Sequence, residues 1–373
     1  MRKVINILSI TIIAMAGSFL ISCNKLNEIF NPKDHMDNMG FVYTMGNGAD
    51  KNTVLVYKQD ANGKLSFGTV YNSGGKGLGK GLGSQGALIL DKASMMLYAV
   101  NAGDNTISSF KVASNGTLQL HQTIGSGGTM PISLSVYKSW LYVVNGGGNI
   151  CGFKVSGMGD LSMIPGSMQK LSNGDAGPAE ILFQPDGSHL VVTEKNTNKI
   201  CTFKVNSMGV AEAPVVNPAY AETPFGFVIA GVNQLIITNA FGGAAGKSVI
   251  SSLSVGDNGV TGLTSSVPNM QTSVCWITLT KDEDYAYVTN TSSNTISSLH
   301  IGAKNRLELV DATAAKTGTA PIDIIVSSDA KFIFNVNSMS RSISGYKIMP
   351  TGGLKNVSEV MDLPASAAGL AVY

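Results

Sequence analysis

The sequence predicts an all-β fold, a closed seven-bladed β-propeller built from four-stranded blades. A strand motif related to Tyr-Val-x-Asn occurs seven times, and its final residues lie 44 to 54 residues apart, which is the repeat length of such blades. Each copy is followed by a turn signal such as Asn62-Gly63, which supplies the positive φ that a two-residue hairpin needs. We expect each copy to form the second strand of one blade. The seven copies end at Asn47, Asn101, Asn145, Glu194, Asn239, Asn290 and Asn337.

The two ends of the predicted ring are incomplete in complementary ways. The first copy, near residue 41, has no strand before it, whereas residues 369–373 form a lone strand after the last blade. Pairing residues 370–373 with residues 42–45 would close the ring and remove a strand edge that invites aggregation. An open β-solenoid or two sandwiches would leave the last strand unpaired. We therefore expect one propeller domain over residues 40–373.

The beginning of the chain carries the pattern of an export signal. A positively charged start is followed by an almost wholly apolar run at residues 4–21, as in a secretory signal peptide. The run ends in Leu-Ile-Ser-Cys23, which resembles the lipobox of bacterial lipoproteins. A plain transmembrane anchor is the alternative, because about 18 apolar residues could just span a bilayer. We expect a lipoprotein signal peptide at residues 1–22 and a polar tether at residues 23–39, which would hold the protein by lipidated Cys23 on a bacterial cell envelope, outside the cytoplasm.

Composition and charge exclude some classes of partner. The chain is 44% hydrophobic and 13% charged, which suits a large folded core. Its net charge of +2 and its three arginines do not provide the basic surface on which nucleic acid binds. Cys151 and Cys201 occupy the same position in successive repeats, too far apart for a disulfide, and we expect them and Cys275 to be free thiols. We expect a monomer without a nucleic-acid partner.

The repeat also places a ring of residues around the predicted central channel. The first strand of each blade starts at the face where the second strand ends, here called the top face, so residues near this start should surround the upper mouth. Two carboxylates, Glu180 and Asp323, would then face each other across the channel, and Trp276 would offer an aromatic surface that stacks on sugars. Alignment of the repeats selects Ala87, Ser133, Glu180, Gly226, Trp276, Asp323 and Gly369.

Further charges are expected at the top face, where the second strands end. Asn is the usual residue there, and its side chain hydrogen-bonds locally at the end of a strand. Blade four instead has Glu194 followed by Lys195. A neighbouring carboxylate raises the pKa of a carboxyl group and a nearby cation lowers it, so such clusters point to functional sites. We predict Glu180 and Glu194 as catalytic residues. The predicted ligand-binding residues are Lys195, Trp276, Asp323 and Arg341.

Two glycine-rich motifs have simpler explanations than ligand binding. Residues 242–248 look like a phosphate-binding loop, but a strand rather than the required helix is expected to follow. The run at residues 74–83 could wrap an anion with its backbone N–H groups, Lys76 and Lys80, although such runs are more often plain connections. No cofactor is expected, except that the two carboxylates and backbone carbonyls at the mouth could hold Ca²⁺.

The repeat resembles that of a known family. Residues 287–290 spell Tyr-Val-Thr-Asn, and the chain from about residue 40 onward is similar to the lactonase-type seven-bladed propellers, which include a 6-phosphogluconolactonase and carboxymuconate-processing enzymes. The resemblance implies hydrolysis of a small sugar lactone or a related sugar acid. Better-known members carry a histidine near the mouth of an inner strand. The histidines of this chain are expected elsewhere, at positions His35, His121, His189 and His300.

Two classes of function remain open. In the first, the top mouth of the channel binds a small sugar lactone, Trp276 stacks on it, and Glu180 or Glu194 activates a water molecule as general base. In the second, the protein is a non-catalytic module of the cell envelope. Its top face would then bind a glycan, a metal or a partner protein without chemistry.

Overall fold

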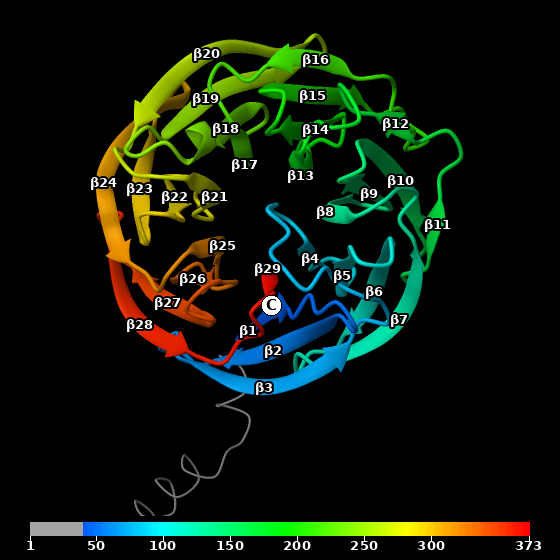
Figure 1. Cartoon of the computed structure of the whole chain (residues 1–373), viewed down its shortest axis with the longest axis horizontal. Coiled ribbons are helices and arrows are strands. Elements are labelled where there is room, and N and C mark those ends of the chain that lie inside the picture. Colours follow the sequence, from blue (N-terminus) through cyan, green and yellow to red (C-terminus); the bar gives the residue numbers. More distant parts are fainter. Residues whose placement is uncertain (1–39) are drawn as a thin grey trace, which may run out of the picture. The chain divides into compact units, whose positions relative to one another are not determined.

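The computed structural model describes residues 40–373, and the predictions for the leader, the tether and Cys23 lie outside the described residues. The described chain forms seven antiparallel sheets around a central channel, as predicted (Figure 1). Each sheet is one blade, and its innermost strand comes first along the chain in every blade except the first. The fold is therefore an all-β, seven-bladed propeller.

The strands follow the predicted repeat. Blades one to three comprise β29 (Ala368–Val372), β1 (Gly40–Met45), β2 (Thr53–Gln59), β3 (Leu65–Asn72); β4 (Leu88–Asp91), β5 (Met96–Asn101), β6 (Thr106–Val112), β7 (Leu118–Gly125); and β8 (Pro131–Tyr137), β9 (Trp140–Asn145), β10 (Asn149–Val155), β11 (Leu161–Met163), with β12 (Gln169–Lys170) also on β10. Blades four and five comprise β13 (Pro178–Phe183), β14 (His189–Glu194), β15 (Lys199–Lys204), β16 (Val215–Pro218); and β17 (Pro224–Ala230), β18 (Gln234–Asn239), β19 (Val249–Gly256), β20 (Gly259–Pro268). Blades six and seven comprise β21 (Val274–Leu279), β22 (Tyr285–Asn290), β23 (Thr295–Gly302), β24 (Arg306–Lys316); and β25 (Pro321–Val326), β26 (Phe332–Asn337), β27 (Ser342–Ile348), β28 (Leu354–Val360).

The ring is closed by the last strand of the chain. β29 pairs antiparallel with β1, and the register sets Val42 opposite Val372 and Thr44 opposite Leu370. Beyond the strand, Phe41 and Tyr373 exchange backbone hydrogen bonds of 2.9 Å in both directions. The first blade therefore takes its inner strand from one end of the chain and its other three strands from the opposite end, which confirms the predicted closure.

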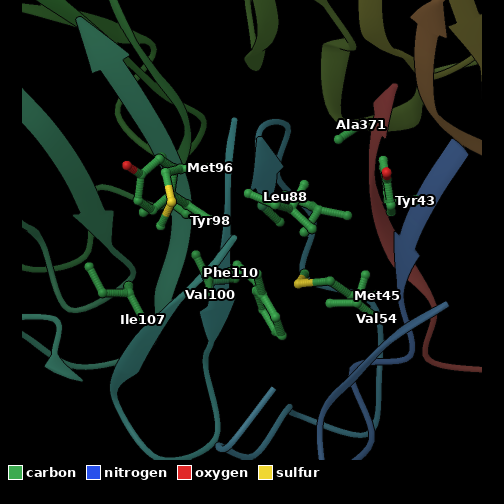
Figure 2. Close-up of a cluster of buried hydrophobic side chains, with 14 of the residues drawn as sticks. Tyr43, Met45, Val54, Leu88, Met96, Tyr98, Val100, Ile107, Phe110 and Ala371 are labelled. Carbon is green, nitrogen blue, oxygen red and sulfur yellow. The ribbon is translucent and has the colours of Figure 1, made fainter. Parts of the chain in front are cut away.

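Neighbouring blades pack face to face through apolar side chains. In the interface drawn in Figure 2, Met45 and Val54 of blade one share a buried cluster with Leu88, Val100 and Phe110 of blade two. Alternate residues of each strand point to opposite faces of its sheet, so every blade presents apolar side chains to both neighbours. Full burial of one such side chain contributes roughly 1.5–3 kcal/mol.

A second set of contacts joins the blades at the bottom face. An aromatic residue at the start of a second strand packs against the hairpin turn of the next blade, as Phe41 does against Gly116 and Trp140 against Gly209. These glycines have φ values of 75° and 79°. A Cβ atom at either position would come within 2.3 Å and 2.5 Å of the neighbouring aromatic ring. Glycine is therefore required both for the turn and for the close approach of the two blades.

The remaining predictions about the fold concern the cysteines and the helices. Cys151, Cys201 and Cys275 are buried free thiols, as predicted. The helices described are two short 3₁₀ turns, η1 (Phe241–Gly243) and η2 (Ala303–Asn305), and no helix within residues 40–373 is long and apolar enough to cross a membrane. The strand β19 follows η1, so residues 242–248 do not form a phosphate-binding loop, which needs a helix.

Candidate functional site

The upper mouth of the channel is filled by a loop, here called the plug loop, which comprises residues 73–87 between β3 and β4. In Figure 1 this connection reaches the middle of the ring. Gln85 bridges two blades across the channel: its backbone N–H donates to the Ala179 carbonyl at 3.0 Å, and its side-chain amide both donates to the Ile277 carbonyl and accepts from the Ile277 N–H, each at 3.0 Å. The plug loop thus separates the channel from the solvent at the top face.

Two predicted ligand-binding residues hold the plug loop. The indole N–H of Trp276 donates to the Ser84 carbonyl at 2.9 Å, and only 6% of Trp276 is exposed. The ammonium group of Lys195 donates to the carbonyls of Gly83 and Pro178 and lies 4.9 Å from the centre of the Phe225 ring. Burial lowers the pKa of Lys195 to about 8. The structure therefore places both side chains behind the loop, whereas the sequence had suggested an open mouth.

The glycine-rich part of the plug loop is packed against the first two blades. The backbone N–H groups of Gly77 and Gly79 donate at 2.8 Å to the carbonyls of Gly48 and Asn47, and the Asn47 amide donates to the Lys80 carbonyl at 2.7 Å. A Cβ atom on Gly77 would lie 2.3 Å from the Asn47 backbone. These N–H groups are already used, so they are not free to wrap an anion.

Glu180 and Asp323, from the inner strands of blades four and seven, line the same cavity at the closed end of the channel, under the plug loop. Their exposed fractions are 2% and 4%. Each carboxyl accepts one backbone N–H from the inner strand of the next blade: Glu180 from Phe227 at 2.7 Å, and Asp323 from Gly369 at 2.8 Å. Each side chain therefore helps to join its blade to the next one.

Burial changes the acidity of both carboxyl groups. It raises the pKa of Glu180 well above its usual value; the hydrogen bond from Phe227 opposes this rise, and the charge of Asp323 adds to it. Burial also raises the pKa of Asp323 to about 7, against the opposing hydrogen bond from Gly369. Burial thus favours the protonated form of both carboxyl groups to higher pH than in an exposed carboxyl, and raised carboxyl pKa values suit groups that donate or accept protons near neutral pH.

The two carboxyl groups line a cavity of about 370 Å³ in the channel, here called the chamber. Its wall is formed by the residues that lie two positions after the predicted ring of Glu180 and Asp323 on each inner strand. Every second residue of a strand faces the same side. Blade three differs, since Ser135 accepts the Phe183 N–H at 2.8 Å instead of lining the chamber. The wall residues are Ile89, Leu182, Val228, Thr278, Ile325 and Ala371.

The chamber continues toward the bottom face. Its lining includes Lys92, in the turn after β4, and a second hollow of about 500 Å³ shares Lys92, Thr278 and Ile325 with it. The Lys92 ammonium donates to the Ser328 hydroxyl at 2.9 Å. Burial and the neighbouring charge of Lys281 lower the pKa of Lys92. Access to the carboxyl pair is therefore from the bottom face, past two lysines.

Glu194 lies apart from this pair. It is fully buried at the top face, where it accepts hydrogen bonds from Ser172, Thr197 and the Cys201 thiol. Burial alone would raise the pKa of Glu194, but these donors together hold it below its usual value. Glu180, by contrast, bonds to the blade that follows. The structure therefore does not bring the two predicted catalytic glutamates together.

Arg341 is also outside the chamber. Arg341 is exposed in the turn after β26, where it has a φ of 53°. Its Nε donates to the Leu363 carbonyl at 2.7 Å. Among the part of the chain that the structure describes, no three side chains of His, Cys, Asp or Glu come together as a metal-binding group. Of the predicted residues, Glu180 and Asp323 thus face the chamber, Lys195 and Trp276 hold its roof, and Glu194 and Arg341 lie elsewhere.

Sequence reasoning missed the plug and the wall. Ser84 and Gln85 are two polar residues between the glycine run and the first inner strand, and this position could have marked them as a structured segment. The wall residues could have been found by counting two positions along each inner strand from the predicted ring residues, such as Glu180 and Asp323. The repeat marks strand positions within one blade and does not mark a loop that crosses the ring.

The fold is thus a seven-bladed propeller with an internal cavity that is lined by two buried carboxyl groups. The chain belongs to the lactonase, seven-bladed β-propeller family, whose family model matches residues 30–151 and 244–369. This membership agrees with the resemblance carried by the Tyr-Val-Thr-Asn repeat. No curated protein sequence matches the chain.

Solved structures of the same fold come from several bacteria. A candidate 6-phosphogluconolactonase from Bacteroides uniformis is 18% identical, with a TM-score of 0.71 over 89% of this chain and 99% of its own. The periplasmic gluconolactonase of Pseudomonas aeruginosa is 16% identical, with a TM-score of 0.69 over 90% of this chain and 99% of its own. At these identities the likeness establishes the fold alone.

Proposed function

We propose that the protein is a hydrolase of small lactones, with Glu180 and Asp323 as its acid–base pair in the chamber. The observation that carries this proposal is the pair itself: two buried carboxyl groups line one cavity in an otherwise largely aliphatic channel. Membership of the lactonase family supports it. The structural relatives described as a periplasmic gluconolactonase and as a candidate 6-phosphogluconolactonase also support it.

The chemistry follows from the raised pKa values of the two carboxyl groups. Asp323, with the pKa of about 7, would take a proton from a water molecule as this attacks the lactone carbonyl carbon. Glu180, whose pKa burial raises well above its usual value, would give a proton to the ring oxygen as the C–O bond breaks. The sum is one lactone plus one water giving one hydroxy acid. The proton then returns from Asp323 to Glu180 through solvent.

Substitution of the two carboxyl groups tests the proposal. In Glu180→Gln and Asp323→Asn, an amide oxygen can still accept the backbone N–H, so the blades stay joined while the acid or base is lost. Loss of a general acid or base lowers the rate about 10²- to 10⁴-fold. We expect this loss in kcat for both variants, and unchanged kcat in Asp50→Asn, which alters an exposed aspartate. Full activity in both chamber variants would refute the role of the pair.

A non-catalytic binding protein is the second candidate, and one observation favours it. Ser133 occupies the same ring position as Glu180 and also accepts a backbone N–H of the next blade, from Ile181 at 3.2 Å. The carboxyl groups could therefore serve mainly as links between blades. A panel of lactones that are bound but not hydrolysed would favour this alternative.

A further inference from the structure

The wall of the chamber offers few hydrogen-bond partners. Four of the side chains in its wall are the aliphatic groups of Ile89, Leu182, Val228 and Ile325, and Thr278 carries the single hydroxyl of this ring. A buried hydroxyl group without a partner costs about 1–3 kcal/mol. A sugar lactone carries several hydroxyl groups, so it would leave most of them unsatisfied against this wall.

Charge along the chamber is divided between its two ends. Among the residues the structure describes, the charged side chains that line it are Glu180 and Asp323 at the closed end and Lys92 at the bottom turn. A phosphate group at the closed end would meet carboxyl groups instead of a cation. The lysines stand at the opposite end, where Lys92 and Lys281 are close enough for their charges to interact.

We propose that the chamber takes an aliphatic lactone, with the lactone group between Glu180 and Asp323 and the alkyl substituent along the wall toward the bottom face. This inference rests on the proposed hydrolase function and names its substrate class. Apolar burial favours the substituent by roughly 25 cal/mol per Å². Hydrolysis would then form a carboxylate, which Lys92 and Lys281 would attract toward the bottom mouth.

Three lactones of increasing polarity and one filled chamber test the proposal. We expect kcat/KM to be at least ten-fold higher for δ-decalactone than for δ-valerolactone, and lowest for glucono-δ-lactone. Val228→Phe should fill the chamber and lower kcat/KM for δ-decalactone at least ten-fold. Val232→Phe is the matched control, because Val232 is 69% exposed in the turn after β17 and should have no effect. Thr278→Val should strengthen the preference for the alkyl lactone.

Binding measurements separate failure of this inference from failure of the proposed function. If glucono-δ-lactone is the preferred substrate and Val228→Phe hydrolyses it as fast as the parent, the aliphatic substrate is overturned and the hydrolase function stands. If no lactone is hydrolysed but δ-decalactone raises the Tm of the parent and not that of Val228→Phe, the aliphatic ligand stands and the hydrolase falls. Neither turnover nor a shift in Tm would overturn both.

Discussion

At the scale of single residues, the channel carboxyl groups combine two tasks. Glu180 and Asp323 each accept an N–H group from the next blade, which ties the inner strands together, and each is buried enough to titrate far from its usual range. Ser133 performs the first task without a titratable group. The use of carboxyl groups at two of these positions therefore adds an acid–base capacity that joining the blades does not require.

The pKa of Asp323 predicts a dependence of stability on pH. The folded-state pKa of about 7 is above the unfolded value of about 3.9, so the folded protein holds this proton more tightly. The contribution of Asp323 to the free energy of unfolding therefore falls as pH rises from about 4 to 7 and is constant above that range. The effect is on the order of 4 kcal/mol. Asp323→Asn should remove it, so the variant should gain stability over the parent at pH 8 and not at pH 4.

Urea unfolding of both proteins across this pH range measures the difference. Asp50→Asn is the control, because Asp50 is exposed and its replacement should leave the pH dependence unchanged. Parallel curves for the parent and Asp323→Asn would contradict the raised pKa.

At the scale of elements, the plug loop decides which face of the propeller gives access to the channel. Its tip is held by Ala179, Trp276 and Ile277, which belong to two different blades. The glycines of the loop allow this path, and Gly86 is the clearest case. It has a φ of 79°, and a Cβ atom there would lie 2.9 Å from the Ser133 hydroxyl oxygen.

Alanine substitutions at two glycines of this loop should therefore have different effects. Gly86→Ala should lower the free energy of unfolding by about 1–2 kcal/mol, because the left-handed conformation disfavours a side chain. Gly81→Ala should change it by less than about 0.5 kcal/mol, since nothing lies within 4 Å of a Cβ atom there. Urea unfolding gives both values, and hydrogen exchange at Ser84 and Gln85 reports loosening of the loop. Equal effects of the two substitutions would contradict the tight passage at Gly86.

At the scale of the whole molecule, the fold depends on joining the two ends of the chain. β29 supplies the inner strand of blade one, and the Gly369 N–H is the group that Asp323 binds. Without this strand, β1 would become an open edge and the ring would lose its last inter-blade link. Open edges of this kind promote association between chains.

Deletion of residues 369–373 tests the closure. We expect a loss of more than about 3 kcal/mol in the free energy of unfolding, from the buried side chains and hydrogen bonds that disappear together. Thermal unfolding should show a lower Tm and a broader transition, and light scattering should show association. A truncated protein that melts like the parent would mean that the closing strand contributes little.

Much of this architecture could be predicted because it repeats locally. The spacing of the strands, the turn glycines and the alternation along each inner strand placed Glu180 and Asp323 in one ring and left residues 369–373 to close it. Such patterns depend on neighbours within one blade, so a single sequence contains them. The prediction that Glu180 and Glu194 both serve one catalytic site had no such basis, since it depended on the directions in which side chains point at the ends of two paired strands.

By itself, the sequence determined the seven blades, their closure and the family of the protein. The tertiary structure alone decided that the plug loop closes the top mouth, that Trp276 and Lys195 hold this loop, and that the chamber is reached from below. The physical reason is sequence distance. The hydrogen bonds from Gln85 to Ile277 and from Trp276 to Ser84 join residues 192 positions apart, and no local repeat encodes a contact made once across the ring.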